Sequence, residues 1–253
     1  MSLTSYLNGR KAKRLTVLFL SAMSLLNSHL TVLESSSSTY SKATAFLTPQ
    51  LDSTGRVEEW RPISYSQFRD DVERFARYWC RVLDNSQIPK HSIIGMWYVY
   101  EKCIFRICLY SCRLSGFSYL DVLHIYGISR AGYVPQLFSI RLPNPVVIYE
   151  LLRKAGAAAL IYDCSFESVL NDCHISRHCV LKSFSVEDVP ATLPSIWDFQ
   201  ELDIAFIFHT SGSTSGIPKL VPINYRWLNS AVVKSHYISV PENASRQDVT
   251  VWM

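Results

Sequence analysis

The apolar positions of the chain follow two patterns, one with the spacing of a helix and one of short continuous runs. The clearest helical pattern begins after Ile63, where Ser64 and Gln67 have the spacing of a capping box. Apolar residues then recur every three or four positions, which places them on one face of a helix. The members of that face are Phe68, Val72, Phe75, Trp79 and Val82. The spacing predicts an amphipathic helix with this face turned toward a core.

Short apolar runs predict buried strands, because a strand covered on both faces shows no polar alternation. Three runs have this character: Ser92–Trp97, Ala157–Tyr162 and Asp203–Phe208. Helices are expected between them, one over Leu120–Arg130 and one that begins at Asn144-Pro145 and ends at Gly156. The alternation of helices with short buried strands predicts an α/β fold with a largely parallel sheet.

The composition is that of a folded protein, since 48% of the 253 residues are hydrophobic and 18% are charged. These values exclude intrinsic disorder, which requires few apolar residues and a high net charge. The net charge of +4 is too small to argue for a nucleic-acid partner. Seven Cys is an odd number, and free thiols in a reducing compartment are the simpler interpretation. We therefore expect a cytoplasmic protein.

The N-terminal region allows a second interpretation. Four basic residues precede the apolar run Leu15–Leu26, as in a secretory signal; they are Arg10, Lys11, Lys13 and Arg14. No small-x-small cleavage site follows, so an amphipathic first helix or a misplaced start codon fits better, and we expect no membrane contact. A secreted or membrane-tethered protein, directed by residues 10–33, is the alternative. The Ser-rich residues 35–44 are expected to form a loop.

The segment after the third apolar run carries the candidate chemistry. Residues 209–219 read His-Thr-Ser-Gly-Ser-Thr-Ser-Gly-Ile-Pro-Lys. The small residues let backbone N–H groups approach a phosphate, and the lysine adds a positive charge. A Walker loop needs glycines one position further apart and no proline before its lysine. A nucleophile elbow needs a serine where Thr214 stands between the glycines. On composition alone, a surface loop without a ligand fits equally well.

Residues 209–222 (HTSGSTSGIPKLVP) resemble the signature of the adenylate-forming, or AMP-binding, enzymes, which include acyl-CoA synthetases and nonribosomal peptide adenylation domains. Two upstream stretches, 63–79 and 121–145, resemble earlier core motifs of the same family, the second of them a helix that leads into a Gly-Tyr-Val-Pro turn. The residues of these motifs are most similar to those of fungal acetyl-CoA-synthetase-like and peptide-synthetase-like proteins. The likeness covers residues 41–253, so residues 1–40 are expected to be an N-terminal extension. It implies the incomplete N-terminal large domain of the family's fold.

The resemblance implies a reaction as well as a fold. In this family a carboxylate attacks the α-phosphate of ATP, with Mg²⁺, and pyrophosphate leaves. A thiol, either coenzyme A or the phosphopantetheine of a carrier-protein domain, then accepts the acyl group. By position, the resemblance assigns the β- and γ-phosphates to Thr210, Ser211, Gly212, Ser213, Thr214, Gly216 and Lys219. It makes Lys219 and Thr214 the catalytic candidates, names no metal ligand, and leaves the small carboxylic acid unidentified.

Three departures separate the chain from the family pattern. Ser215 is an extra residue in the loop. Residues 98–118 have no counterpart, and we interpret this Cys-rich segment as an insertion translated from a retained intron; a Cys metal cluster lacks the usual spacing. In the family, the acyl pocket, the adenine and ribose contacts and the small C-terminal domain lie beyond the position of Met253. We therefore expect no ligase activity from this chain alone, and a non-catalytic remnant is the alternative interpretation.

Other polar residues are candidates for binding a metal ion or a phosphate. Cys173, His174, His178 and Cys179, with Cys164 nearby, do not have a standard zinc spacing, so packed or solvated side chains are favoured. His209 adjoins the phosphate loop, where it can orient a phosphate or carboxylate, or equally make a structural hydrogen bond to a neighbouring strand. The acids Asp70, Asp71 and Glu73 are expected on the solvated face of their helix.

Overall fold

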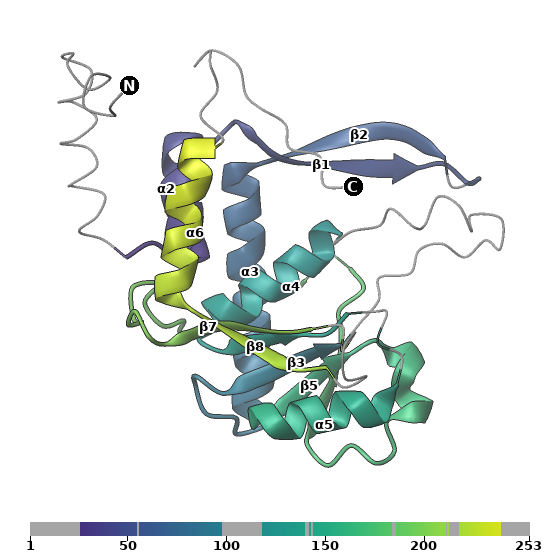
Figure 1. The fold of residues 1–253 in the computed structure, drawn as a ribbon. Coiled ribbons are helices and arrows are strands. Elements are labelled where there is room, and N and C mark those ends of the chain that lie inside the picture. Colours follow the sequence, from purple (N-terminus) through teal and green to yellow (C-terminus); the bar gives the residue numbers. More distant parts are fainter. Residues whose placement is uncertain are drawn as a thin grey trace, which may run out of the picture.

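A computed structural model of the chain describes residues 26–54, 56–97, 118–139, 142, 144–183, 186–210, 212 and 218–238. Residues 15–25 of the predicted N-terminal helix and nearly all of the predicted insertion therefore lie outside the described residues. Figure 1 shows a central sheet with α3 and α4 on one face and α5 on the other, and a β1–β2 hairpin that projects from the body. This layered arrangement confirms the predicted α/β fold class.

The main sheet has the strand order β6-β5-β3-β4-β7-β8 in the described part of the chain. The strands are β3 (Ile93–Trp97), β4 (Val134–Leu137), β5 (Ala159–Tyr162), β6 (Ser176–Cys179), β7 (Ile204–His209) and β8 (Leu220–Asn224). All neighbouring pairs are parallel except β7 with β8, which is antiparallel. The three strands predicted from apolar runs are β3, β5 and β7. The structure confirms all three, and their ends differ from the predicted ends by no more than two residues.

Helix α3 (Tyr65–Asn85) is the predicted amphipathic helix. The Ser64 hydroxyl accepts a hydrogen bond from the backbone N–H of Gln67 at 3.2 Å, which satisfies one of the free donors of the first turn. Phe68, Phe75 and Trp79 are buried along its apolar face, as predicted. The helix thereby brings a row of large side chains against α4 and the sheet.

The caps of α4 (Tyr119–Arg130) and α5 (Pro145–Ala155) explain where these helices begin and end. Ser118 and Asp121 form a capping box at the start of α4. The Asn144 side chain accepts from the N–H of Val146 at 3.0 Å. Gly156 ends α5 with a φ of +70°, a left-handed conformation that a Cβ would disfavour. Both helices were predicted, with the Asn cap and the Gly terminus.

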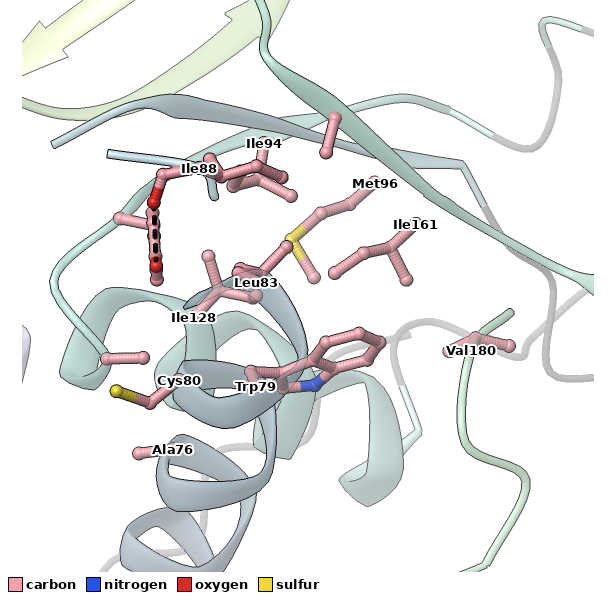
Figure 2. Close-up of a cluster of buried hydrophobic side chains, with 13 residues drawn as sticks. Ala76, Trp79, Cys80, Leu83, Ile88, Ile94, Met96, Ile128, Ile161 and Val180 are labelled. Carbon is pink, nitrogen blue, oxygen red and sulfur yellow. Dashed lines mark hydrogen bonds between the residues drawn. The ribbon is translucent and has the colours of Figure 1, made fainter. Parts of the chain in front are cut away.

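Figure 2 shows the core between α3, α4 and the sheet, where the Trp79 ring lies beneath Met96 and Ile161. A second cluster lies on the other face, where Ile148, Leu151 and Leu152 of α5 pack toward the sheet. Each face of the sheet therefore has its own apolar cover, which is the physical reason that the central strands read as continuous apolar runs.

The predicted loop over residues 35–44 is wrong for residues 35–39 and for Thr44. Helix α2 (His29–Thr39) covers 35–39, a turn spans 40–43 as predicted, and β1 (Thr44–Leu51) begins at the end of the range. Ser28 caps α2, and Leu30 and Leu33 are buried, so the contacts of α2 outweigh the low helix propensity of its serines. The boundary at residue 40 stays a prediction, although Leu33 packs in the same cluster as α3 and α4.

Several further elements were not predicted, among them the strands β6 and β8. Strand β2 (Val57–Ser64) pairs with β1 in the projecting hairpin, helix α6 (Tyr225–Ile238) follows β8, and a 3₁₀ turn η3 spans Cys164–Val169. The segment interpreted as a Gly-Tyr-Val-Pro turn contains strand β4, because only Gly132, with a φ of +87°, makes the turn and Val134 already pairs with Ile93. At the start of α2, Asn27 donates to Asn229 of α6 at 3.0 Å.

Two side-chain expectations are also corrected. Asp71 is 6% exposed instead of solvated, because it accepts a hydrogen bond of 2.7 Å from the Tyr119 hydroxyl and pairs with Arg74. Asp70 is exposed, as predicted. The expectation of free thiols is wrong for Cys164 and Cys179, which form a disulfide that joins η3 to the edge strand β6.

Candidate functional site

The predicted phosphate loop is the connection between two antiparallel strands. β7 ends at His209, β8 begins at Leu220, and these two residues are register partners. The backbone N–H of Thr210 donates to the carbonyl of Lys219 at 2.9 Å. The N–H of Lys219 donates in return to Thr210 Oγ1 at 3.0 Å. The first and last candidate residues therefore meet at the base of a closed hairpin.

This base leaves the polar groups of both residues suited to an anion. A hydroxyl oxygen that accepts a hydrogen bond keeps its own proton for donation, so Thr210 Oγ1 can accept from Lys219 and donate to a ligand. Lys219 uses its backbone groups in the hairpin, and the residue is exposed, so its ammonium group is accessible to a ligand. Gly212 has a φ of +71°, which lets the chain turn sharply just after the strand.

The structure settles the position of only part of the predicted set. Thr210, Gly212 and Lys219 lie together at the hairpin. Four other predicted residues lie outside the described residues: Ser211, Ser213, Thr214 and Gly216. The extra Ser215 lies there as well. Their roles stay predictions.

The hairpin lies at the edge of the sheet where ligands bind in open α/β folds. The parallel strands β3, β4, β5 and β7 all end at this carboxyl edge. The chain passes from β3 to β4 on one side and then to β5 on the other, so the strand order reverses around β3. Such a reversal opens a crevice outside the carboxyl ends of the strands. The position of the hairpin is therefore the expected one for a ligand site.

His209, the residue before the loop, makes the structural hydrogen bond that was one of its two predicted roles. Its Nε2 accepts from the backbone N–H of Ser139 at 2.9 Å, and its Nδ1 contacts the carbonyl of Thr210 at 3.0 Å. Its ring is stacked on Phe138, with centroids 6.0 Å apart. Ser139 and Phe138 follow the neighbouring strand β4. Sequence reasoning missed both as parts of the site, although they stand in the second family-like stretch.

The Cys-His cluster does not assemble a metal site. Within the described ranges, no group of three or more His, Cys, Asp or Glu side chains is arranged to hold a metal ion. Cys179 is joined to Cys164, and the His178 ring is hydrogen-bonded to Ser176. Burial lowers the pKa of His178, which keeps the ring neutral. These contacts are structural.

A polar cavity of about 650 Å³ lies along the outer face of α3 and was not predicted. Four arginines line it, namely Arg69, Arg74, Arg77 and Arg130. Each is already paired: Arg69 with Glu34 at 2.8 Å, Arg77 with Asp188 at 2.7 Å, Arg130 with Glu73 at 2.5 Å, and Arg74 with Asp71. The acids neutralise the positive charge that an anionic ligand would need, so the network ties α2, α3 and α4 together instead.

None of the helices in the described part of the chain is long and apolar enough to cross a membrane.

Comparison with known proteins agrees with the sequence signature. A curated relative, the AMP-binding domain-containing enzyme iboA of Amanita muscaria, is 28% identical over 215 residues, which are 82% of this chain. The chain spans only 38% of the length of that relative. No family model matches the chain.

Solved structures show a similar fold. One is O-succinylbenzoate coenzyme A synthetase of Bacillus subtilis in complex with ATP and magnesium, with a TM-score of 0.59 and 15% identity over 83% of this chain and 47% of that one. Another is the N-terminal subdomain of NpsA of Klebsiella oxytoca in complex with 3-hydroxybenzoyl-AMSN, with a TM-score of 0.56 and 19% identity over 79% and 42%. These likenesses confirm the fold that the sequence resemblance implied.

Proposed function

We propose that this chain, which has the fold of the N-terminal domain of adenylate-forming enzymes and resembles that family in sequence, supplies the triphosphate-binding hairpin of an acid–thiol ligase. The observation that carries the proposal is the closed base of the hairpin, where Thr210 and Lys219 are held together at the carboxyl edge of the sheet. A polyphosphate bound there meets a hydroxyl donor and an ammonium group.

In the proposed reaction, a carboxylate oxygen forms a bond to the α-phosphorus of ATP and the bond to the pyrophosphate oxygen breaks. The products are an acyl-adenylate and pyrophosphate. A thiol, from coenzyme A or a phosphopantetheine arm, then displaces AMP and yields a thioester. Mg²⁺ enters with the nucleotide and neutralises part of the phosphate charge. The chain's contribution is to hold the leaving pyrophosphate, so that its charge is stabilised as it develops.

Lys219 is proposed as the charged group of this site, and nucleotide binding tests it directly. We expect Lys219→Ala to weaken the binding of MgATP to the 253-residue chain by about tenfold, a loss typical of a charge-assisted hydrogen bond. Isothermal titration calorimetry with MgATP is the measurement. Lys234→Ala, at an exposed lysine of α6, is the matched control and should bind like wild type.

Equal affinity of Lys219→Ala and wild type would remove Lys219 from the site. Absence of measurable MgATP binding by wild type would favour the alternative, a non-catalytic remnant.

The proposal also covers the two other substrates of the reaction, a small carboxylic acid and an acceptor thiol. A longer chain that also carries the other family motifs should exchange pyrophosphate into ATP only when a suitable aliphatic or aryl acid is present. The 253-residue chain alone is expected to show no turnover above a Lys219→Ala background. An adenylating site must orient the acid and nucleotide together, which can be worth roughly 7–11 kcal/mol of the barrier. Turnover by the chain alone would mean that self-association or a partner completes the site.

A further inference from the structure

The hydrogen bonds of His209 fix both its protonation state and its orientation. A backbone N–H can only donate, so the contact from Ser139 at 2.9 Å makes Nε2 an acceptor without a proton. The proton of the neutral ring then lies on Nδ1, which donates to the carbonyl of Thr210 at 3.0 Å. The imidazole is therefore a neutral bridge with one defined tautomer.

This bridge spans two segments that are far apart in the sequence. Ser139 follows β4 and lies 70 residues before His209. Thr210 begins the phosphate loop, and its N–H and Oγ1 are both engaged by Lys219. With its carbonyl bound to the imidazole, every backbone polar group of Thr210 has a partner. The first residue of the loop is thus held from β8 on one side and from the end of β4 on the other.

We propose that His209 is the positioning residue of the phosphate loop, and that its neutral Nδ1–H tautomer sets the affinity of the loop for a nucleoside triphosphate. This inference rests on the proposed function, because the triphosphate is the ligand assigned to the loop. The imidazole touches no phosphate in this role. It acts through Thr210, whose hydroxyl and backbone keep their direction only while both hydrogen bonds of the ring are made.

Protonation of the ring breaks the bridge. An imidazolium has N–H groups at both nitrogens, so Nε2–H would face the N–H of Ser139 with no acceptor between them. Among the described residues, the ring contacts three uncharged groups: the backbone of Ser139, the backbone of Thr210 and the Phe138 ring. Lys219 lies one position before Leu220, the register partner of His209.

Three substitutions separate the two hydrogen bonds from the ring stacking. His209→Gln places an amide oxygen near Nε2 and can accept from Ser139. His209→Asn places an amide nitrogen near Nδ1 and can donate only to Thr210. His209→Phe keeps the ring on Phe138 and makes neither bond. We expect MgATP binding to the 253-residue chain to be about fivefold to tenfold weaker for Gln and for Asn, as for loss of one hydrogen bond, and weaker again for Phe, which loses both.

The tautomer of the ring distinguishes positioning from general support of the fold. Nitrogen NMR of histidine-labelled protein should show His209 with its proton on Nδ1 at pH 8. Circular dichroism confirms folding of each variant, and if His209→Phe does not fold, the Gln and Asn pair still tests the proposal.

The outcomes are distinct. Wild-type affinity of the Gln or the Asn variant, or a proton on Nε2, would overturn the positioning role, while nucleotide binding by wild type upholds the proposed function. Failure of wild type itself to bind MgATP, with the Nδ1–H tautomer present, would overturn the proposed function and the inference with it.

Discussion

Two buried histidines show how the same residue type is used in different ways. His124 is 0% exposed, its Nδ1 accepts from the indole N–H of Trp79 at 2.9 Å, and its Nε2 donates to the carbonyl of Leu181 at 3.1 Å. His29 is packed between the rings of Tyr126 and Phe206, and neither of its nitrogens has a partner among the described residues. Burial lowers the pKa to about 4 for His124 and to about 3 for His29.

These two pKa values predict loss of stability in mild acid. Both folded-state values lie below the unfolded value of about 6.5, so the unfolded chain binds protons first as the pH falls. The contribution of each histidine to the free energy of unfolding is fully present above about pH 6.5. Below that pH it falls by roughly 1.4 kcal/mol per pH unit, down to about pH 4 for His124 and about pH 3 for His29. At pH 5 the combined loss should be on the order of 4 kcal/mol. Urea unfolding at pH 7 and pH 5 measures it.

His29→Phe isolates one of the two contributions. Phenylalanine keeps the stacking on Tyr126 and Phe206 and removes two buried nitrogens without partners, so stability at pH 7 should be unchanged or higher. The loss between pH 7 and pH 5 should halve. His124→Phe is the contrast, because it leaves the Trp79 donor and the Leu181 acceptor unpaired and should cost about 1–3 kcal/mol already at pH 7. An unchanged acid profile of His29→Phe would contradict the assignment.

At the scale of elements, the packing of α3 against α4 depends on a glycine. A Cβ at Gly127 would lie 2.9 Å from Phe75 Cβ and 3.2 Å from the Phe75 backbone carbon. Neither atom can move away without moving the helix. The position therefore needs Gly for close approach, although it lies within α4, where alanine has the higher helix propensity.

Gly127→Ala should destabilise the protein by about 1–3 kcal/mol, because overpacking of this contact outweighs the gain in helix propensity. Chemical denaturation measures the change. Gly156→Ala is the matched control: no atom lies within 4 Å of its Cβ position, so it tests only the cost of its φ of +70°, about 1–2 kcal/mol. A stabilised Gly127→Ala variant would show that the two helices separate at little cost.

The disulfide gives a second prediction at this scale. Cys164 and Cys179 close a loop of 15 residues between η3 and β6, and β6 is an edge strand with one neighbour, β5. Reduction should lower the free energy of unfolding by about 3 kcal/mol, since the unfolded chain regains the entropy of that loop. Thermal unfolding with and without reductant measures it. Cys164→Ser, as control, should not respond to the reductant.

At the scale of the whole molecule, the segment 98–117 lies between β3, which ends at Trp97, and the α4 cap Ser118. Connections from strand to helix in α/β units usually need about 2–6 residues. We expect replacement of residues 98–117 by a four-residue Gly-Ser linker to keep the fold and raise the soluble yield, because an apolar, Cys-rich stretch is removed.

Soluble yield and circular dichroism of the shortened chain test the replacement. A scrambled segment of the same composition is the control and should give the same soluble yield as the wild type. Loss of the fold on replacement would show that the segment is required. A mature transcript that still encodes the segment would contradict its interpretation as a retained intron.

The sequence by itself determined the elements whose signals are local. The face from Phe68 to Trp79, the caps at Ser64 and Asn144, and the terminus at Gly156 depend on residues within one or two turns of each other, so their spacing was sufficient. The hydroxyl-rich loop was predicted for the same reason, since its candidate residues are contiguous and match a specific motif, but its closure into a hairpin with β8 was not. The fold class followed from the alternation of these elements.

Only the tertiary structure decided what depends on residues far apart in the chain. Asp71 is buried because Tyr119 reaches it from α4, and the serines of α2 are helical because Leu33 packs against other helices. His209 meets Ser139 only because β4 and β7 become neighbours in the sheet. The energy of such contacts comes from partners that no local pattern identifies, and it exceeds the small preferences that the local sequence expresses.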